Sequence, residues 1–477
     1  MIYHHTGSKD TYITNKVLEG VTRATGANVG YASTIDLFKL HNESSLSGTT
    51  SDIQELSRGL LYFDLDTLKS NIQNQTSLSE STLKIELVLS DIQGSQIAPS
   101  NFTLELYPMS AAWDEGVGSD VAGFSDLQAC NWTERSLDTE WSTPGGDIGT
   151  YSSSYIAAQT FTKGTENLKM DVTAWIQAYW NETHANNGWA LKFTSAQETD
   201  SKSYFVKRFA SRHSRNPFIR PRLEASWEDY HLDDRLNFEA GTTNTISISN
   251  IRNDVATALG ETPALTLSYG TWTKTDATIS GVSLAGVAQT GRYSAAVGAI
   301  DVYGTDSALA TDLIASGSIL LQEKWTVSSG AQIVHSGSFR LVNPLATNTN
   351  APRDLRFTIV DLKSTYTVNE TPTIRLFIRE RSVEPRSVRQ PLNLPSLSLK
   401  KAYYQVRDFN TKKILIPFSD GLSTANESTR ISSDGNGMYF SFPASVLPRG
   451  RVYTIEIAHY DRGKRRIYEP NQVFRIQ

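Results

Sequence analysis

Apolar residues alternate with polar residues in nearly every hydrophobic stretch of this chain, and no other feature constrains its fold as strongly. A period of two places successive side chains on opposite faces of a β-strand, so each such stretch can bury one face. The alternating sets are Leu83, Ile85, Leu87 and Leu89; Phe102, Leu104 and Leu106; Ile374, Leu376 and Ile378; Met438, Phe440 and Phe442; and Tyr453, Ile455 and Ile457. Turn-forming Ser, Thr, Asn and Gly residues separate them. The pattern predicts an all-β protein of antiparallel β-sandwiches.

Helical periodicity is clearest in one short stretch. Val172, Ile176, Tyr179 and Trp180 fall at helical spacing behind Asp171, which is a suitable N-cap residue. We expect two or three helical turns there, and core positions for Trp175, Trp180 and Trp189 because large aromatic side chains are mostly packed.

The length of 477 residues exceeds what one hydrophobic core usually serves. One boundary is expected near Tyr230, and a second in Val383 to Pro395, where prolines among Arg, Ser and Asn predict a stiff linker. We therefore expect three tandem β-sandwich modules, at 1–230, 231–390 and 391–477.

Cys130 is the single cysteine, so neither an internal disulfide nor an all-cysteine metal site is possible. The chain has no apolar run long enough to span a bilayer, and its first residues lack the pattern of a secretory signal. These features predict assembly in a reducing cytoplasm and no membrane association.

Charge is divided unevenly along the chain. Residues 375–477 hold 18 Lys and Arg against 9 Asp and Glu, whereas residues 1–374 hold 27 against 41. The two parts therefore carry +9 and −14, and we expect them to face different surroundings.

The first module resembles the DNRLRE-type β-sandwich domain, a relative of carbohydrate-binding modules found in bacterial surface proteins and phage structural proteins. The resemblance rests on landmarks that occur in order along the whole module. They are Asp10-Thr11-Tyr12-Ile13, Arg58 to Leu65, Trp113 to Gly118, Asp171-Val172-Thr173, Asn187 to Leu191, Phe209 to Arg212 and Pro221 to Glu224. The resemblance implies a jelly-roll-like sandwich. Within it, we expect Arg58 and Asp64 to pair across the edges of a central strand.

The last module is similar to immunoglobulin-like segments in structural proteins of large contractile-tailed bacteriophages. About 85 residues carry this similarity, which rests on Tyr403 to Val406, Ile416 to Phe418, Arg430 to Met438, Leu447 to Arg451 and Tyr460 to Gly463. It implies an immunoglobulin-like fold and a place in a virion.

Catalytic and cofactor motifs are missing from the sequence. Gly281-Val282-Ser283-Leu284-Ala285 lacks the last glycine of a nucleophile elbow, and no phosphate-binding glycine pattern occurs. The eight histidines are scattered without the one-turn spacing of a zinc site. We therefore expect a protein that is not an enzyme and has no cofactor or metal.

Sugar binding without catalysis is the main alternative. Trp113, Trp132 and Trp141 could stack on a sugar, with Asp114, Glu115 and Asp147 as hydrogen-bond acceptors. The other interpretation is that these aromatic residues cap the end of the sandwich or fill an interface. We favour the second interpretation.

A basic run near the chain end is the candidate docking site. Arg462, Lys464, Arg465 and Arg466 lie in a strand-and-turn context that predicts a hairpin. No stacking platform for bases accompanies them, so we expect an acidic protein surface as the partner and no nucleic acid.

These observations predict a non-enzymatic structural protein of a tailed-phage virion, in the tail, baseplate, neck or head surface. Its partners would be other virion proteins, in several copies of a symmetric assembly formed in the host cytoplasm. A glycan-binding adhesin or receptor-binding module that recognises a host surface glycan is the alternative. A degrading tail spike is a third possibility, but the long repeats typical of such enzymes do not occur.

Overall fold

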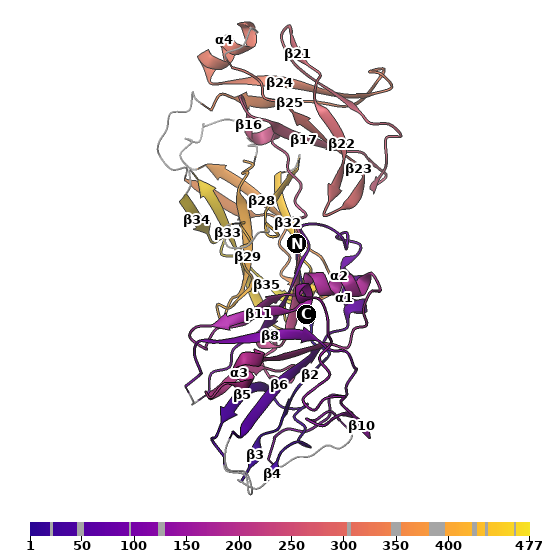
Figure 1. The fold of residues 1–477 in the computed structure, drawn as a ribbon. Helices are drawn as coiled ribbons and strands as arrows, with labels where there is room; N and C mark the ends of the chain where they lie inside the picture. The colour runs from indigo at the N-terminus through magenta and orange to yellow at the C-terminus, as the bar shows by residue number, and fades with distance from the viewer. Residues whose placement is uncertain are drawn as a thin grey trace. The chain divides into compact units, whose positions relative to one another are not determined.

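The computed structural model describes residues 1–19, 22–44, 52–94, 97–122, 129–302, 307–344, 354–380, 396–421, 427–434, 437–461 and 464–477. Sheets dominate its regular structure, so the expected all-β class is confirmed. The described residues divide into two compact units: Tyr3–Asn74 with Leu83–Ser226, and Met1–Ile2 with Gln75–Thr82 and Trp227–Gln477. We call them the N-terminal and C-terminal units (Figure 1).

Two larger sheets make up most of the regular structure of the N-terminal unit. In the first, the strand order is β1 (Ile2–Thr6), β15 (Arg222–Ser226), β7 (Lys84–Leu89) and β12 (Leu168–Asp171). In the second, the order is β11 (Ala157–Phe161), β8 (Phe102–Pro108), β13 (Trp189–Phe193), β6 (Gln54–Tyr62), β5 (Thr34–His41) and β14 (Tyr204–Ala210), and β2 (Lys9–Thr14) also pairs with β6. The inward residues of the alternating sets at 83–89 and 102–106 are buried, as predicted.

The expected helix is α2 (Thr173–Trp180), and Asp171 accepts a hydrogen bond from the Thr173 amide. Val172 occupies the N-cap position, one residue later than expected. Trp175, Trp180 and Trp189 are buried, as predicted. The expected Arg58–Asp64 pair is wrong, because Arg58 pairs with Glu198 and Asp64 caps α1 (Leu65–Ile72).

The C-terminal unit contains two sandwiches in sequence. The middle sandwich has one sheet of β16 (Phe238–Glu239), β25 (Gln332–Val342), β24 (Ser318–Val327), β20 (Ala264–Tyr269) and β21 (Trp272–Lys274), and another of β17 (Asn244–Ser249), β23 (Val287–Val297) and β22 (Thr278–Leu284). One apolar core joins the two sheets and includes Ile246, Trp325 and Leu341.

The C-terminal sandwich also has two sheets. One has the order β26 (Leu355–Ile359), β28 (Thr373–Glu380), β32 (Gly437–Ser441) and β31 (Ser432–Asp434). The other has the order β27 (Thr365–Tyr366), β35 (Val473–Ile476), β33 (Val452–Asp461), β29 (Ala402–Asp408) and β30 (Ile414–Ile416), and β34 (Lys464–Tyr468) pairs with β33.

The remaining elements are short. They are β3 (Val17–Leu18), β4 (Thr22–Arg23), β9 (Glu134–Ser136), β10 (Thr139–Glu140), η1 (Ser153–Tyr155), α3 (Ser195–Thr199), η2 (Pro217–Ile219), η3 (Arg235–Asn237), β18 (Ile251–Arg252), β19 (Val255–Ala256), α4 (Ser307–Ser316) and η4 (Ala444–Val446). Among the described residues, no helix is both long enough and apolar enough to cross a bilayer.

The module boundaries differ from those expected. The two units separate between Ser226 and Trp227, close to the predicted position near 230. The boundary expected at 390/391 is wrong, because β28 pairs with β32 and strands from both sides of it share one sheet. The whole expected linker, Val383 to Pro395, lies outside the described residues, and in sequence it falls between two strands of one sandwich.

Candidate functional site

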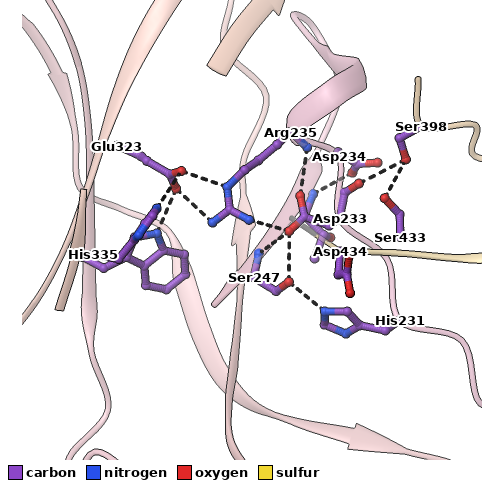
Figure 2. Close-up of polar contacts among 12 residues, drawn as sticks. His231, Asp233, Asp234, Arg235, Ser247, Glu323, His335, Ser398, Ser433 and Asp434 are labelled. Atoms are coloured by element: carbon purple, nitrogen blue, oxygen red, sulfur yellow. Dashed lines mark hydrogen bonds and ion pairs between the residues drawn. The ribbon is translucent and has the colours of Figure 1, made fainter. Parts of the chain in front are cut away.

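A buried polar cluster surrounds the connector between residues 231 and 237, where the chain enters the middle sandwich (Figure 2). Asp233 and Asp234 are 2% and 3% exposed, and Arg235 begins η3. Buried charges are stable only when partners replace the lost water, so the hydrogen bonds of these side chains decide what the cluster can do.

Arg235 is held between two carboxylates. Its Nε and Nη2 donate to the two carboxylate oxygens of Glu323 at 2.8 and 3.0 Å, and its Nη1 donates to Asp233 Oδ2 at 2.5 Å. Burial opposes ionisation of Glu323, but Arg235 outweighs it and holds the pKa of Glu323 below its ordinary value. Burial likewise opposes the charge of Arg235, yet Asp233 and Glu323 raise the pKa of Arg235. The planar guanidinium suits this two-sided arrangement.

Glu323 has two further partners, Trp325 and His335, and Figure 2 labels the second. Trp325 Nε1 donates to its Oε2 at 2.9 Å, and His335 Nε2 lies 3.4 Å from its Oε1. All three side chains come from β24 and β25, so the middle sandwich supplies the wall to which Arg235 is fixed.

The junction contains the three residue types of a hydrolase triad, as Ser247, His231 and Asp233. Their hydrogen bonds, however, run in a different order from those of a catalytic triad. The Ser247 hydroxyl donates to Asp233 Oδ2 at 3.0 Å and lies 2.7 Å from His231 Nε2, so serine stands between histidine and aspartate. In a catalytic triad the imidazole stands in the middle and takes the serine proton. Ser247 and His231 are each only 7% exposed, and burial lowers the pKa of His231. The geometry therefore favours a structural role.

The same connector is attached to the C-terminal sandwich. His231 N donates to Ser432 Oγ at 2.8 Å, and His231 O accepts from Ser433 N at 2.7 Å. Ser398 Oγ lies 3.4 Å from Asp233 O and 2.8 Å from Ser433 Oγ, within hydrogen-bonding distance of both. One seven-residue segment thus carries hydrogen bonds to both sandwiches of the C-terminal unit. We call this cluster the junction.

The proposed sugar-stacking residues are buried. Trp113, Trp132 and Trp141 are 3%, 7% and 4% exposed and pack in one cluster with Met109 and Cys130. Trp113 Nε1 donates to Asn187 O and Trp141 Nε1 to Asn131 O. None of the three offers a free face, so the sugar-stacking interpretation does not fit their geometry, and they pack as a cap on the sandwich.

Two of the three acceptors named with these tryptophans, Asp147 and Glu115, have structural partners. Asp147 Oδ1 accepts from the Thr143 amide at 3.1 Å, and Asp114 is exposed. Glu115 binds Arg212 through two hydrogen bonds of 2.6 and 2.5 Å and also accepts from the Asp10 amide. Asp10 is 1% exposed, and burial raises its pKa to about 7.

The basic hairpin exists where it was predicted. β33 pairs with β34, with Asp461 opposite Lys464 and Tyr460 opposite Arg465. Lys464 and Arg465 are exposed, and the Arg465 guanidinium lies 4.6 Å from the centre of the Phe418 ring. Because side chains alternate along a strand, Arg465 faces away from Lys464 and Arg466. Arg462 lies outside the described residues.

The junction was not predicted from the sequence, although one residue of β24, a glutamate at an inward position, indicates a buried charge. Ile319, Leu321, Glu323 and Trp325 occupy successive inward positions of that strand. A carboxylate in such an apolar series requires a buried cationic partner. The partner, Arg235, is far away in sequence, so the pair is visible only once the fold is known.

Comparison with known proteins gives distant matches among solved structures. No protein-family model matches the chain, and no curated protein does. Fibronectin(III)-like modules of Clostridium thermocellum CbhA match at 13% identity, covering 50% of this chain and 86% of that one, with a TM-score of 0.16. A chimeric titin Z1Z2 matches at 12% identity, covering 50% and 91%, with a TM-score of 0.17. The mouse nectin-like molecule 4 ectodomain matches at 9% identity, covering 82% and 94%, with a TM-score of 0.14.

Proposed function

We propose that this protein is a non-enzymatic structural component of a tailed-phage virion, assembled in the host cytoplasm. It docks onto other virion proteins, in several copies, through its β-sandwiches. The observation that carries the proposal is that strand β34, at the edge of the C-terminal sandwich, exposes a cation on each of its two faces, Lys464 and Arg465. They belong to a segment of charge +9 in a chain whose remainder is −14.

Two further features support a structural role. The charged groups of the junction hold the connector in place. Its serine and histidine are buried, and the order of their hydrogen bonds does not suit catalysis. The aromatic residues that could have stacked on a sugar are core residues instead. The resemblance of both chain ends to domains of phage structural proteins points in the same direction.

The basic hairpin provides the test. Replacing Lys464, Arg465 and Arg466 by Ser should reduce the number of copies per particle, and the difference from wild type should shrink between about 50 and 500 mM salt because screening weakens the attraction that these charges supply in the wild type. Quantitative mass spectrometry of purified particles measures this.

The matched control replaces three basic residues of the middle sandwich, Arg252, Lys324 and Arg340, by Ser. All three are exposed, and the change in net charge is the same. Normal incorporation of the hairpin variant would refute docking through this hairpin. If incorporation were lost only when the N-terminal unit was disrupted, the N-terminal unit rather than the C-terminal sandwich would be the part that attaches the chain to the particle.

A further inference from the structure

Strand β26 forms an open edge of the C-terminal sandwich. It pairs with β28 on one side, and among the described residues no strand pairs with its other side. A groove of about 380 Å³ runs along that side, lined by Leu355 to Thr358 and by Tyr468 to Gln472. The rings of Phe357 and Tyr468 are 4.4 Å apart, so an apolar contact connects the two walls.

The register identifies the backbone groups that face this groove. Val360 N donates to Arg375 O at 3.0 Å, so residues 360 and 375 form a hydrogen-bonded pair of the antiparallel ladder. Such pairs recur at every second residue, which places Arg356 and Thr358 in hydrogen-bonded pairs too. The N–H and C=O groups of Leu355, Phe357 and Ile359 therefore point away from β28. Among the described residues no backbone hydrogen bond to these groups is found, and a row of unpaired peptide groups is a template for an added strand.

The exposed face of this edge carries two arginines without anionic partners. Arg356 lies directly opposite Arg379, both are exposed, and no ion pair to either is found among the described residues. Like charges in this position destabilise a sheet. Arg375, also on β28, differs because Asp434 binds it with two hydrogen bonds of 3.0 and 2.9 Å. A carboxylate that neutralised Arg356 and Arg379 would lie on a strand added at the open edge of β26.

We propose that β26 receives an extended acidic segment of a partner protein as an added strand. A carboxylate of that segment lies beside Arg356 and Arg379, and an apolar side chain on its other face enters the groove near Phe357 and Tyr468. This inference rests on the proposed docking function and names the element the partner contributes. The basic strand β34 ends at Tyr468 and so leads to the same groove.

Charged residues on an edge strand can also serve to prevent strand addition. That role predicts that an acidic strand does not bind, so one experiment separates the two roles. The probe is a ten-residue peptide of alternating Glu and Val, and the control peptide alternates Lys and Val. Both are added to the full-length protein, and residue-resolved hydrogen exchange is followed.

In the free protein the amides of Leu355, Phe357 and Ile359 should exchange fast, and those of Arg356 and Thr358 slowly. Saturating Glu–Val peptide should slow the first three at least tenfold, while the Lys–Val peptide should have no effect. Arg379→Glu places opposite charges across β26 and β28, which keeps the sheet stable and neutralises Arg356. This variant should bind the Glu–Val peptide at least tenfold more weakly, whereas the exposed control Arg252→Glu should bind it normally.

Three results would overturn the inference: unchanged exchange at residues 355, 357 and 359 with saturating Glu–Val peptide, equal binding of both peptides, or protection of these amides by single-stranded oligothymidine but not by the peptide. Particle incorporation is measured separately. If the chain is present in virions but does not bind the peptide, only this inference is refuted. If the chain is absent from virions, the proposed function is refuted.

Discussion

At the scale of single residues, the sandwiches combine apolar cores with a few buried charges that are paired across long sequence distances. Lys39 and Lys207, both 0% exposed, pair with Asp200 and Asp91 in the N-terminal unit, and Arg235 pairs with Glu323 in the other. Removing one member of such a pair leaves the other charge buried without compensation. These residues should therefore be among the most sensitive to substitution.

The Arg235–Glu323 pair allows this to be measured. Arg235→Met should lower the free energy of unfolding of the C-terminal unit by about 3–5 kcal/mol, because Glu323 stays buried without its cation. Adding Glu323→Leu should recover part of that loss, since it removes one of the two carboxylates left without a cation, while Asp233 still lacks Arg235. Denaturant unfolding of the single and double variants gives the coupling energy. Additive losses would contradict the role given to this pair.

Asp10 gives the N-terminal unit a defined pH dependence. Its pKa is about 7 in the folded protein, because of burial, against 3.8 ordinarily. Between these values the unfolded chain has released the proton that the folded protein keeps, so this group lowers stability as pH rises from about 4 to 7.

Asp10→Asn should abolish that contribution. Its stability relative to wild type should increase with pH across this window, with a slope of up to about 1.4 kcal/mol per pH unit. Urea unfolding at several pH values measures the slope. Asp138→Asn, at an exposed position, is the control and should give a flat difference. A flat difference for Asp10→Asn would show that burial of this carboxyl has no such effect.

At the scale of elements, alternation alone predicts the strands that form the cores, because it reflects burial of one face. Ile374, Leu376 and Ile378 are buried as expected, as are Tyr453, Ile455 and Ile457. Which strands pair depends on long-range contacts. The prolines between β28 and β29 suggested a boundary between modules, but the pairing of β28 with β32 is a tertiary feature without a local signal.

Residue chemistry in the N-terminal unit was predicted less well than its strands. Trp113, Trp132 and Trp141 lie in loop-like sequence, where the pattern cannot show whether an indole faces solvent or caps a core. Arg58 was expected to pair with Asp64, but Glu198 comes within reach only through α3. A partner that the fold brings from a distant segment cannot be read from local sequence.

Trp141 tests the interpretation of these tryptophans as core residues. Trp141→Ala should destabilise the N-terminal unit by about 3–5 kcal/mol, the usual cost of emptying a buried aromatic site. Thermal or denaturant unfolding measures the loss, and Leu137→Ala, at an exposed position nearby, should cost little. The wild-type protein should show no submillimolar binding on an array of bacterial surface glycans. Such binding, lost in a folded Trp113→Ala or Trp141→Ala variant, would support the sugar-binding alternative.

At the scale of the whole molecule, charge and architecture divide the chain at different places. The excess of basic residues begins near residue 375, inside the C-terminal sandwich that starts at β26. A deletion from residue 391 would leave β28 without β32, so it would unfold the strands before it as well as remove the docking surface. Truncations that test docking should therefore remove residues from 355 onward.

The central claim is that this chain is a structural part of a virion. Mass spectrometry of gradient-purified, intact virions tests this claim most directly. We expect the chain to be present at a fixed number of copies per particle, in constant ratio to the other structural proteins through successive purification steps. Its absence from intact particles, or a ratio that falls toward zero as purification proceeds, would show that it is not a structural part of the virion.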